Sequence, residues 1–142
     1  MSIACAEQMS SPEKSGLADA VLREILALLD VFAATGETAC IDLGGLPLSR
    51  DDRSDLDDCL GRGEIVATLN IVGRSEIWET AFSGVWRVRH FGADQIAVDL
   101  VEISSCAEIL RTDRRDARLA VARLTQALEQ RNAANAEMSD EK

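Results

Sequence analysis

LGRGEIVATLNIVGRSEIWETAFSGVWRVRH, residues 60–90, holds both tryptophans and the only histidine of the chain. Its β-branched and aromatic residues come in three short runs, separated by breaks that contain glycine at 73–75 and 83–84. Such runs, bounded by glycine and serine, are typical of strands joined by tight turns. The segment therefore predicts three antiparallel strands, around which the rest of the chain is arranged.

A fourth strand is expected at 95–103, where apolar and polar residues alternate after the turn cluster at 91–94. Cys40–Leu43 is a candidate for a short further strand. Together these segments predict an α+β fold, an antiparallel β-meander of four or five strands covered by about three helices.

The third strand of the 60–90 segment has two different faces, because successive side chains of a strand point to opposite sides. One face carries Val85, Arg87 and Arg89, and the other carries Trp86, Val88 and His90. We expect the apolar side to be packed and the charged side to lie near water, as in many antiparallel sheets.

Apolar residues at helical spacing predict three helices. The first runs from Gly16 to about Ala34 and has a wide apolar face, which packs within the domain or forms an oligomer interface. The second runs to about Leu60 and is capped by Ser49. The third begins at Thr112 and is expected to pack on the sheet or on the first helix.

Chain length and composition favour one domain, because the chain has 142 residues and is 46% hydrophobic. We expect a single domain at 16–131 between flexible tails at 1–15 and 132–142, since both ends are polar.

The net charge of -10, from 25 acidic and 15 basic residues, argues against nucleic acid and anionic membrane surfaces as partners. No apolar run approaches the roughly 20 residues needed to cross a bilayer, so we expect no membrane insertion. The acids are concentrated in residues 1–72 and the arginines in 111–131, an asymmetry that can guide docking to a partner or simply mark solvated helix faces.

The four cysteines predict neither a metal site nor a disulfide framework. Cys5, Cys40, Cys59 and Cys106 are widely spaced, whereas zinc sites usually contain pairs separated by two residues. The chain shows no secretory leader, so reduced thiols in the cytoplasm are the better interpretation. The acidic helix after Ser49 also lacks the glycine and glutamate of a calcium loop.

Several motifs in order carry a family resemblance, and they lie within about Leu46–Leu110. They are Leu46-Pro47-Leu48 before an acidic helix, then Leu60-Gly61-Arg62-Gly63-Glu64, Ser75-Glu76-Ile77-Trp78-Glu79-Thr80 and Gly84-Val85-Trp86-Arg87-Val88-Arg89-His90. This pattern resembles the conserved C-terminal region of the HupH/HyaF hydrogenase expression proteins, and the short chain is more similar to the HupJ/HoxT-type members.

The resemblance implies an accessory, chaperone-like protein of [NiFe] uptake hydrogenase maturation in the cytoplasm. Its partner would be a hydrogenase precursor, in particular the iron–sulfur small subunit before twin-arginine export, or another accessory protein. The family pattern contains no established catalytic residues and implies no cofactor, so we expect a binding protein and not an enzyme.

The candidate partner-binding residues cluster in these motifs. They are Glu64, Glu76, Trp78, Glu79, Thr80, Trp86, Arg87, Arg89 and His90. Glu76 and Glu79 are three residues apart on a predicted strand, so they point to opposite faces and do not form a carboxylate pair for acid–base chemistry. The two tryptophans fit cross-strand neighbours, and either both anchor the core or one is exposed to a partner.

Three alternatives stay open at this point. The first is a cysteine-dependent redox protein or enzyme that uses Cys59 with His90. The second is a metal carrier of the same pathway, although one histidine and dispersed thiols are a poor ligand set. The third is a structural homodimer with the first helix at its interface.

Overall fold

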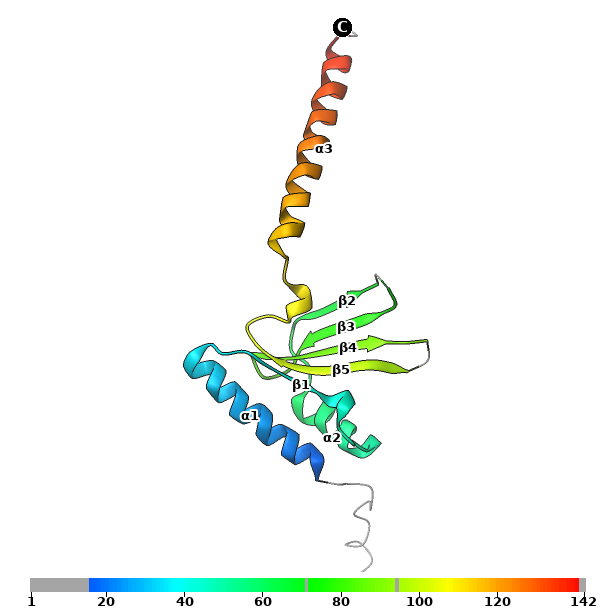
Figure 1. Ribbon diagram of the computed structural model, residues 1–142. Coiled ribbons are helices and arrows are strands. Elements are labelled where there is room, and N and C mark those ends of the chain that lie inside the picture. Colours follow the sequence, from blue (N-terminus) through cyan, green and yellow to red (C-terminus); the bar gives the residue numbers. More distant parts are fainter. Residues whose placement is uncertain (1–15, 71, 94, 141–142) are drawn as a thin grey trace, which may run out of the picture. The chain divides into compact units, whose positions relative to one another are not determined.

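The computed structural model describes residues 16–70, 72–93 and 95–140, so the predicted tail at 1–15 lies outside the described residues. The chain divides into two compact units, one up to Glu108 and one from Ile109, which we describe separately. The elements in chain order are α1 (Leu17–Thr35), β1 (Ala39–Asp42), the 3-10 turn η2 (Leu43–Gly45), α2 (Arg50–Leu60), β2 (Val66–Leu69), β3 (Ser75–Glu79), β4 (Val85–Phe91), β5 (Ile96–Ile103), the 3-10 turn η3 (Glu108–Leu110) and α3 (Arg114–Asp140) (Figure 1).

The sheet has five antiparallel strands in the order β1-β5-β4-β3-β2. The predicted meander is confirmed, because β2 to β5 are neighbours in chain order. The candidate strand near Cys40 is confirmed as β1, which pairs with β5 from Ala39 opposite Ile103 to Asp42 opposite Leu100. The fold is therefore α+β, as the sequence predicted.

Helices α1 and α2 lie on the same side of the sheet (Figure 1) and share one hydrophobic core with it. The buried members of this core come from both helices, from three strands and from η2: Ala18, Val21, Ile25, Ile41, Leu43, Leu56, Leu60, Val85, Val101 and Ile103. The apolar stripe predicted on the first helix thus packs within the domain.

The start of α2 is fixed by the predicted cap. The Ser49 hydroxyl accepts a hydrogen bond from the Asp52 amide at 3.0 Å, and the Asp52 carboxylate accepts one from the Ser49 amide at 3.0 Å. This reciprocal capping box satisfies two backbone donors that a helix end leaves unpaired. The helix that begins at this cap carries Asp57, which accepts a hydrogen bond from Arg87 of β4.

The expectation that the charged face of the sheet lies near water is wrong. Arg87 faces α2 and is only 2% exposed, while Trp86 and Val88 on the opposite face are also buried. The physical reason is that two carboxylates, Asp57 from α2 and Asp99 from β5, accept hydrogen bonds from the arginines and permit their burial.

Gly63 is a position where no side chain fits. Its amide donates a hydrogen bond to the Glu79 carbonyl at 2.7 Å, and a Cβ atom there would lie 2.6 Å from the Thr80 carbonyl oxygen. We expect Gly63→Ala to destabilise the fold by about 1–3 kcal/mol in urea unfolding, because the backbone must shift. Gly92→Ala is the control, since its Cβ would meet nothing closer than 3.5 Å. An equal loss in both variants would contradict this account.

The second unit consists mainly of α3, none of whose residues is buried. The helix extends to Asp140, so residues 132–140, which we expected to be part of a flexible tail, are helical. The predicted packing of this helix on the sheet or on α1 stays a prediction.

Candidate functional site

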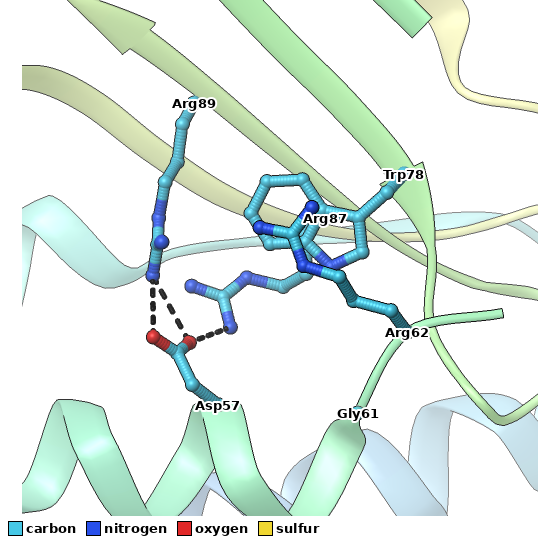
Figure 2. A pocket seen from close by; sticks show the side chains of 6 residues that line it. All are labelled: Asp57, Gly61, Arg62, Trp78, Arg87 and Arg89. Atoms are coloured by element: carbon cyan, nitrogen blue, oxygen red, sulfur yellow. Dashed lines mark hydrogen bonds and ion pairs between the residues drawn. The ribbon is translucent and has the colours of Figure 1, made fainter. Parts of the chain in front are cut away.

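A cluster of charges with a buried centre, Arg87 and Asp99, lies between α2 and the sheet. We call Arg53, Asp57, Arg87, Arg89 and Asp99 the arginine–aspartate cluster. Asp99 is 1% exposed and accepts hydrogen bonds from Arg53 at 3.0 Å, Arg87 at 2.9 Å and Arg89 at 3.4 Å. Asp57 accepts from Arg87 at 2.8 Å and from Arg89 at 3.0 Å through both carboxylate oxygens (Figure 2). Two carboxylates thus hold three guanidinium groups at the helix–sheet interface.

The two carboxylates of the cluster favour the charged form of Arg89 despite its partial burial. Burial by itself lowers the pKa of Arg89, but the hydrogen bond and charge of Asp57 and the charge of Asp99 outweigh it, so the pKa is raised. With three positive and two negative groups, the cluster carries one excess positive charge inside a chain of net charge -10. It is a local positive centre in an acidic protein.

Trp78 forms one wall of a small cleft beside this cluster. Its side chain is 3% exposed, and the guanidinium carbon of Arg62 lies 4.3 Å from its ring centroid, a cation–π contact. Arg89 and Arg87 approach the same ring at 5.2 and 5.5 Å. The cleft has a volume of about 60 Å³ and is lined by Asp57, Gly61, Arg62, Trp78, Arg87 and Arg89 (Figure 2). We call it the arginine cleft.

A second hollow, the apolar groove, has a volume of about 200 Å³ and lies between α1, the end of α2 and the β3–β4 turn. Its lining contains no charged residue: Leu22, Ile25, Leu26, Leu29, Cys59, Leu60, Phe82 and Val85. Leu26 is 67% exposed and Phe82 is 48% exposed. The C-terminal end of α2 borders both hollows, because Asp57 lines the cleft and Cys59 lines the groove.

Four of the nine predicted site residues are buried in this structure: Trp78, Thr80, Trp86 and Arg87. Two of them, Trp78 and Arg87, nevertheless line the arginine cleft. The Trp86 indole donates to the Ser104 carbonyl at 3.2 Å, and the Thr80 hydroxyl accepts from the Phe82 amide at 3.2 Å within the β3–β4 turn. The expectation that the tryptophans are cross-strand neighbours is wrong. Trp78 pairs with Arg87 and Trp86 pairs with Glu79, which places the two rings on opposite faces.

The other five candidates are at least partly accessible, and a role in partner contact stays a prediction for them. Glu64 is exposed, Glu76 forms an ion pair with Arg74, and Glu79 is half-buried. Glu76 and Glu79 point to opposite faces, as predicted. Arg89 belongs to the arginine–aspartate cluster, and the remaining residue, His90, is hydrogen-bonded through Nδ1 to the Ser75 hydroxyl.

The structure does not bring Cys59 and His90 together. Cys59 lies on α2, on the side of the sheet that the arginines face, whereas His90 alternates with Arg89 and therefore faces the other side. Cys40, Cys59 and Cys106 are free thiols. Burial, with the nearby Glu102 and Asp42 carboxylates, raises the pKa of Cys40 and keeps this thiol protonated.

Asp57, Asp99 and Arg62 were missed by sequence reasoning. Asp99 did carry a signal, because strand alternation puts it on the same face as the buried Val101. An acid on a packed face indicates a buried cation on a neighbouring strand. For the apolar groove, the indication in the sequence was the wide apolar face of the first predicted helix.

The described ranges contain neither a candidate metal site nor a candidate membrane span. No group of three or more histidine, cysteine, aspartate or glutamate side chains there could hold a metal ion. Across the same ranges, no helix combines the length and the apolar character that crossing a membrane requires.

Comparison with known proteins gives consistent matches. Residues 17–131 match the family described as HupH hydrogenase expression protein, C-terminal conserved region. The hydrogenase expression/formation protein HupH of Rhodobacter capsulatus is 31% identical over 108 residues, covering 74% of this chain and 39% of that protein. The hydrogenase-1 operon protein HyaF of Escherichia coli is 36% identical over 76 residues, covering 52% of this chain and 26% of that protein.

Among solved structures, the hydrogenase expression protein HupH from Thiobacillus denitrificans superimposes with a TM-score of 0.77 at 37% identity. The match covers 82% of this chain and 98% of that one. Against the curated relatives, by contrast, the chain spans about two fifths of their length or less.

Proposed function

Because the chain belongs to the HupH hydrogenase expression protein family, we propose that it assists [NiFe] hydrogenase maturation by binding a precursor polypeptide, without catalysis. The proposed client is the precursor of the iron–sulfur small subunit, and the proposed setting is the cytoplasm. The names of the relatives support a role in hydrogenase expression or formation, and the choice of client comes from the family resemblance of the motifs.

The apolar groove is the observation that carries this proposal. Small-molecule sites place a few polar groups among apolar ones to orient a reacting ligand, and no charged side chain lines this groove. An exposed apolar surface on a soluble domain instead favours contact with another polypeptide. Leu26 and Phe82 are exposed apolar residues of its lining and are the natural anchors for an apolar segment of the client.

The net charge of the chain also affects which residues are favoured in the client around its apolar segment. A net charge of -10 attracts a polypeptide with basic residues and repels an acidic one. We therefore propose that the client segment is apolar where it fills the groove and carries a net positive charge in the residues around it.

A protein that acts only by binding does not need its thiols, and this can be tested in cells that make the hydrogenase. We expect affinity-tagged chain to retain the small-subunit precursor. We expect a variant with Cys40 and Cys106 changed to serine, and Cys59 changed to alanine so that the groove stays apolar, to retain as much and to support the same hydrogenase activity. The reason is that these three thiols form no disulfide, and no group of three or more histidine, cysteine, aspartate or glutamate side chains in the described residues could hold a metal ion. Loss of hydrogenase activity with intact folding and capture would favour a redox role instead.

A further inference from the structure

Arg87 carries an unused hydrogen-bond donor at the arginine cleft. The side chain is 2% exposed, and its two terminal nitrogens bind Asp57 and Asp99 at 2.8 and 2.9 Å. Its Nε is buried and has no hydrogen-bond partner among the described residues. A buried donor of a charged group is costly to leave unpaired, so an acceptor is expected in the cleft that Arg87 lines.

The charge around the cleft favours a negatively charged acceptor. Three arginines line the cleft with one carboxylate, Asp57, and both oxygens of that carboxylate already accept hydrogen bonds from Arg89. Arg62 stacks on Trp78 and has no ion-pair partner within the described part of the chain. The charged side chains of the lining have an excess of two positive charges, one of which is offset by Asp99 through its hydrogen bonds with Arg87 and Arg89.

The size of the cleft selects among anions. One water molecule needs about 10–15 Å³ of such space, so about 60 Å³ accommodates a flat group of a few heavy atoms. A planar carboxylate matches the fork of a guanidinium group, and three guanidinium groups line this cleft.

We propose that the arginine cleft is a carboxylate-binding site that receives an aspartate or glutamate side chain of the bound polypeptide. Arg62 closes over the carboxylate from the outside, and Arg87 Nε donates to it from the inside. This assignment of the carboxylate's source rests on the proposed function. The end of α2 borders both hollows, so one polypeptide can fill the groove with an apolar segment and the cleft with a single acid.

The first arm of the test uses acetate with the isolated chain and needs no client. In ¹⁵N-resolved NMR spectra, sodium acetate is expected to shift the Arg87 Nε–H and Trp78 indole N–H signals saturably, and sodium chloride at equal ionic strength is not. Arg62→Gln should weaken acetate binding at least about fivefold without unfolding the chain, because Arg62 is exposed. Arg74→Gln is the matched control, since Arg74 also lies over a ring, that of Phe91, at 5.6 Å.

The second arm compares precursor binding by wild type and Arg62→Gln. We expect the variant to bind the precursor at least about fivefold more weakly, and Arg74→Gln to bind like wild type. The absence of a saturable acetate shift, or an equal shift with chloride, would show a water-filled cleft and overturn the carboxylate site. Acetate binding with unchanged precursor binding would overturn the acidic side chain as the ligand. The result of the acetate experiment does not depend on whether the chain binds the precursor, so the carboxylate site and the proposed function can fail separately.

Discussion

Asp99→Asn is expected to lower the free energy of unfolding by about 3–5 kcal/mol, the usual range for removing one partner of a buried ion pair. The substitution keeps the shape of the side chain and removes its charge. Asp99 is 1% exposed and holds Arg53, Arg87 and Arg89, so its loss leaves Arg87 buried with Asp57 alone. Asp57 is 40% exposed and is already shared with Arg89.

Urea unfolding followed by tryptophan fluorescence measures this effect, since Trp78 and Trp86 are both buried in the folded state. The control is Glu76→Gln, which breaks the ion pair with Arg74, whose side chain is 61% exposed. An accessible pair of this kind contributes at most about 1 kcal/mol. Similar small losses in the two variants would show that the arginine–aspartate cluster does not hold α2 on the sheet.

Leu26→Asp is expected to weaken precursor binding at least about tenfold, because it places a charge in the apolar groove where the client segment is proposed to pack. Leu26 is 67% exposed, so the substitution leaves the hydrophobic core intact. Val31→Asp is the matched control, since Val31 lies on the same helix, is 42% exposed and does not line the groove. Dissociation constants for the purified precursor give the comparison.

Equal weakening by both variants would mean that added negative charge, and not the groove, determines binding. Sedimentation of the chain without the precursor measures its oligomeric state and tests whether the groove serves self-association. If wild type forms a dimer that Leu26→Asp dissociates, the groove serves self-association through α1, which is the homodimer that the sequence left open.

The sheet was predictable because its signals are local. Glycine breaks and alternation between residues 60 and 103 determine the strands and turns, and Ser49 with Asp52 determines the start of α2. The C-terminal extent of α3 was missed because polarity was taken as a sign of a tail. Residues 132–140 include alanine, glutamate and methionine, which favour helix without any tertiary contact.

The candidate site was predictable only in part, because its geometry depends on pairings that are distant in sequence. Arg87 and Arg89 were identified, but their burial requires Asp57, about thirty residues earlier, and Asp99 on the next strand. Neither pairing has a characteristic spacing. Trp78 similarly looked like an anchor for a partner, whereas Arg62 from the loop after α2 covers its ring.

The most direct test of the proposed binding role is calorimetric titration of the purified chain with the purified small-subunit precursor, followed by mass measurement of both polypeptides. The predicted result is saturable binding of one precursor per chain, with the masses of both proteins unchanged. A titration without saturable heat at concentrations of tens of micromolar, or a covalent change in either polypeptide, would contradict a protein that acts by binding its client.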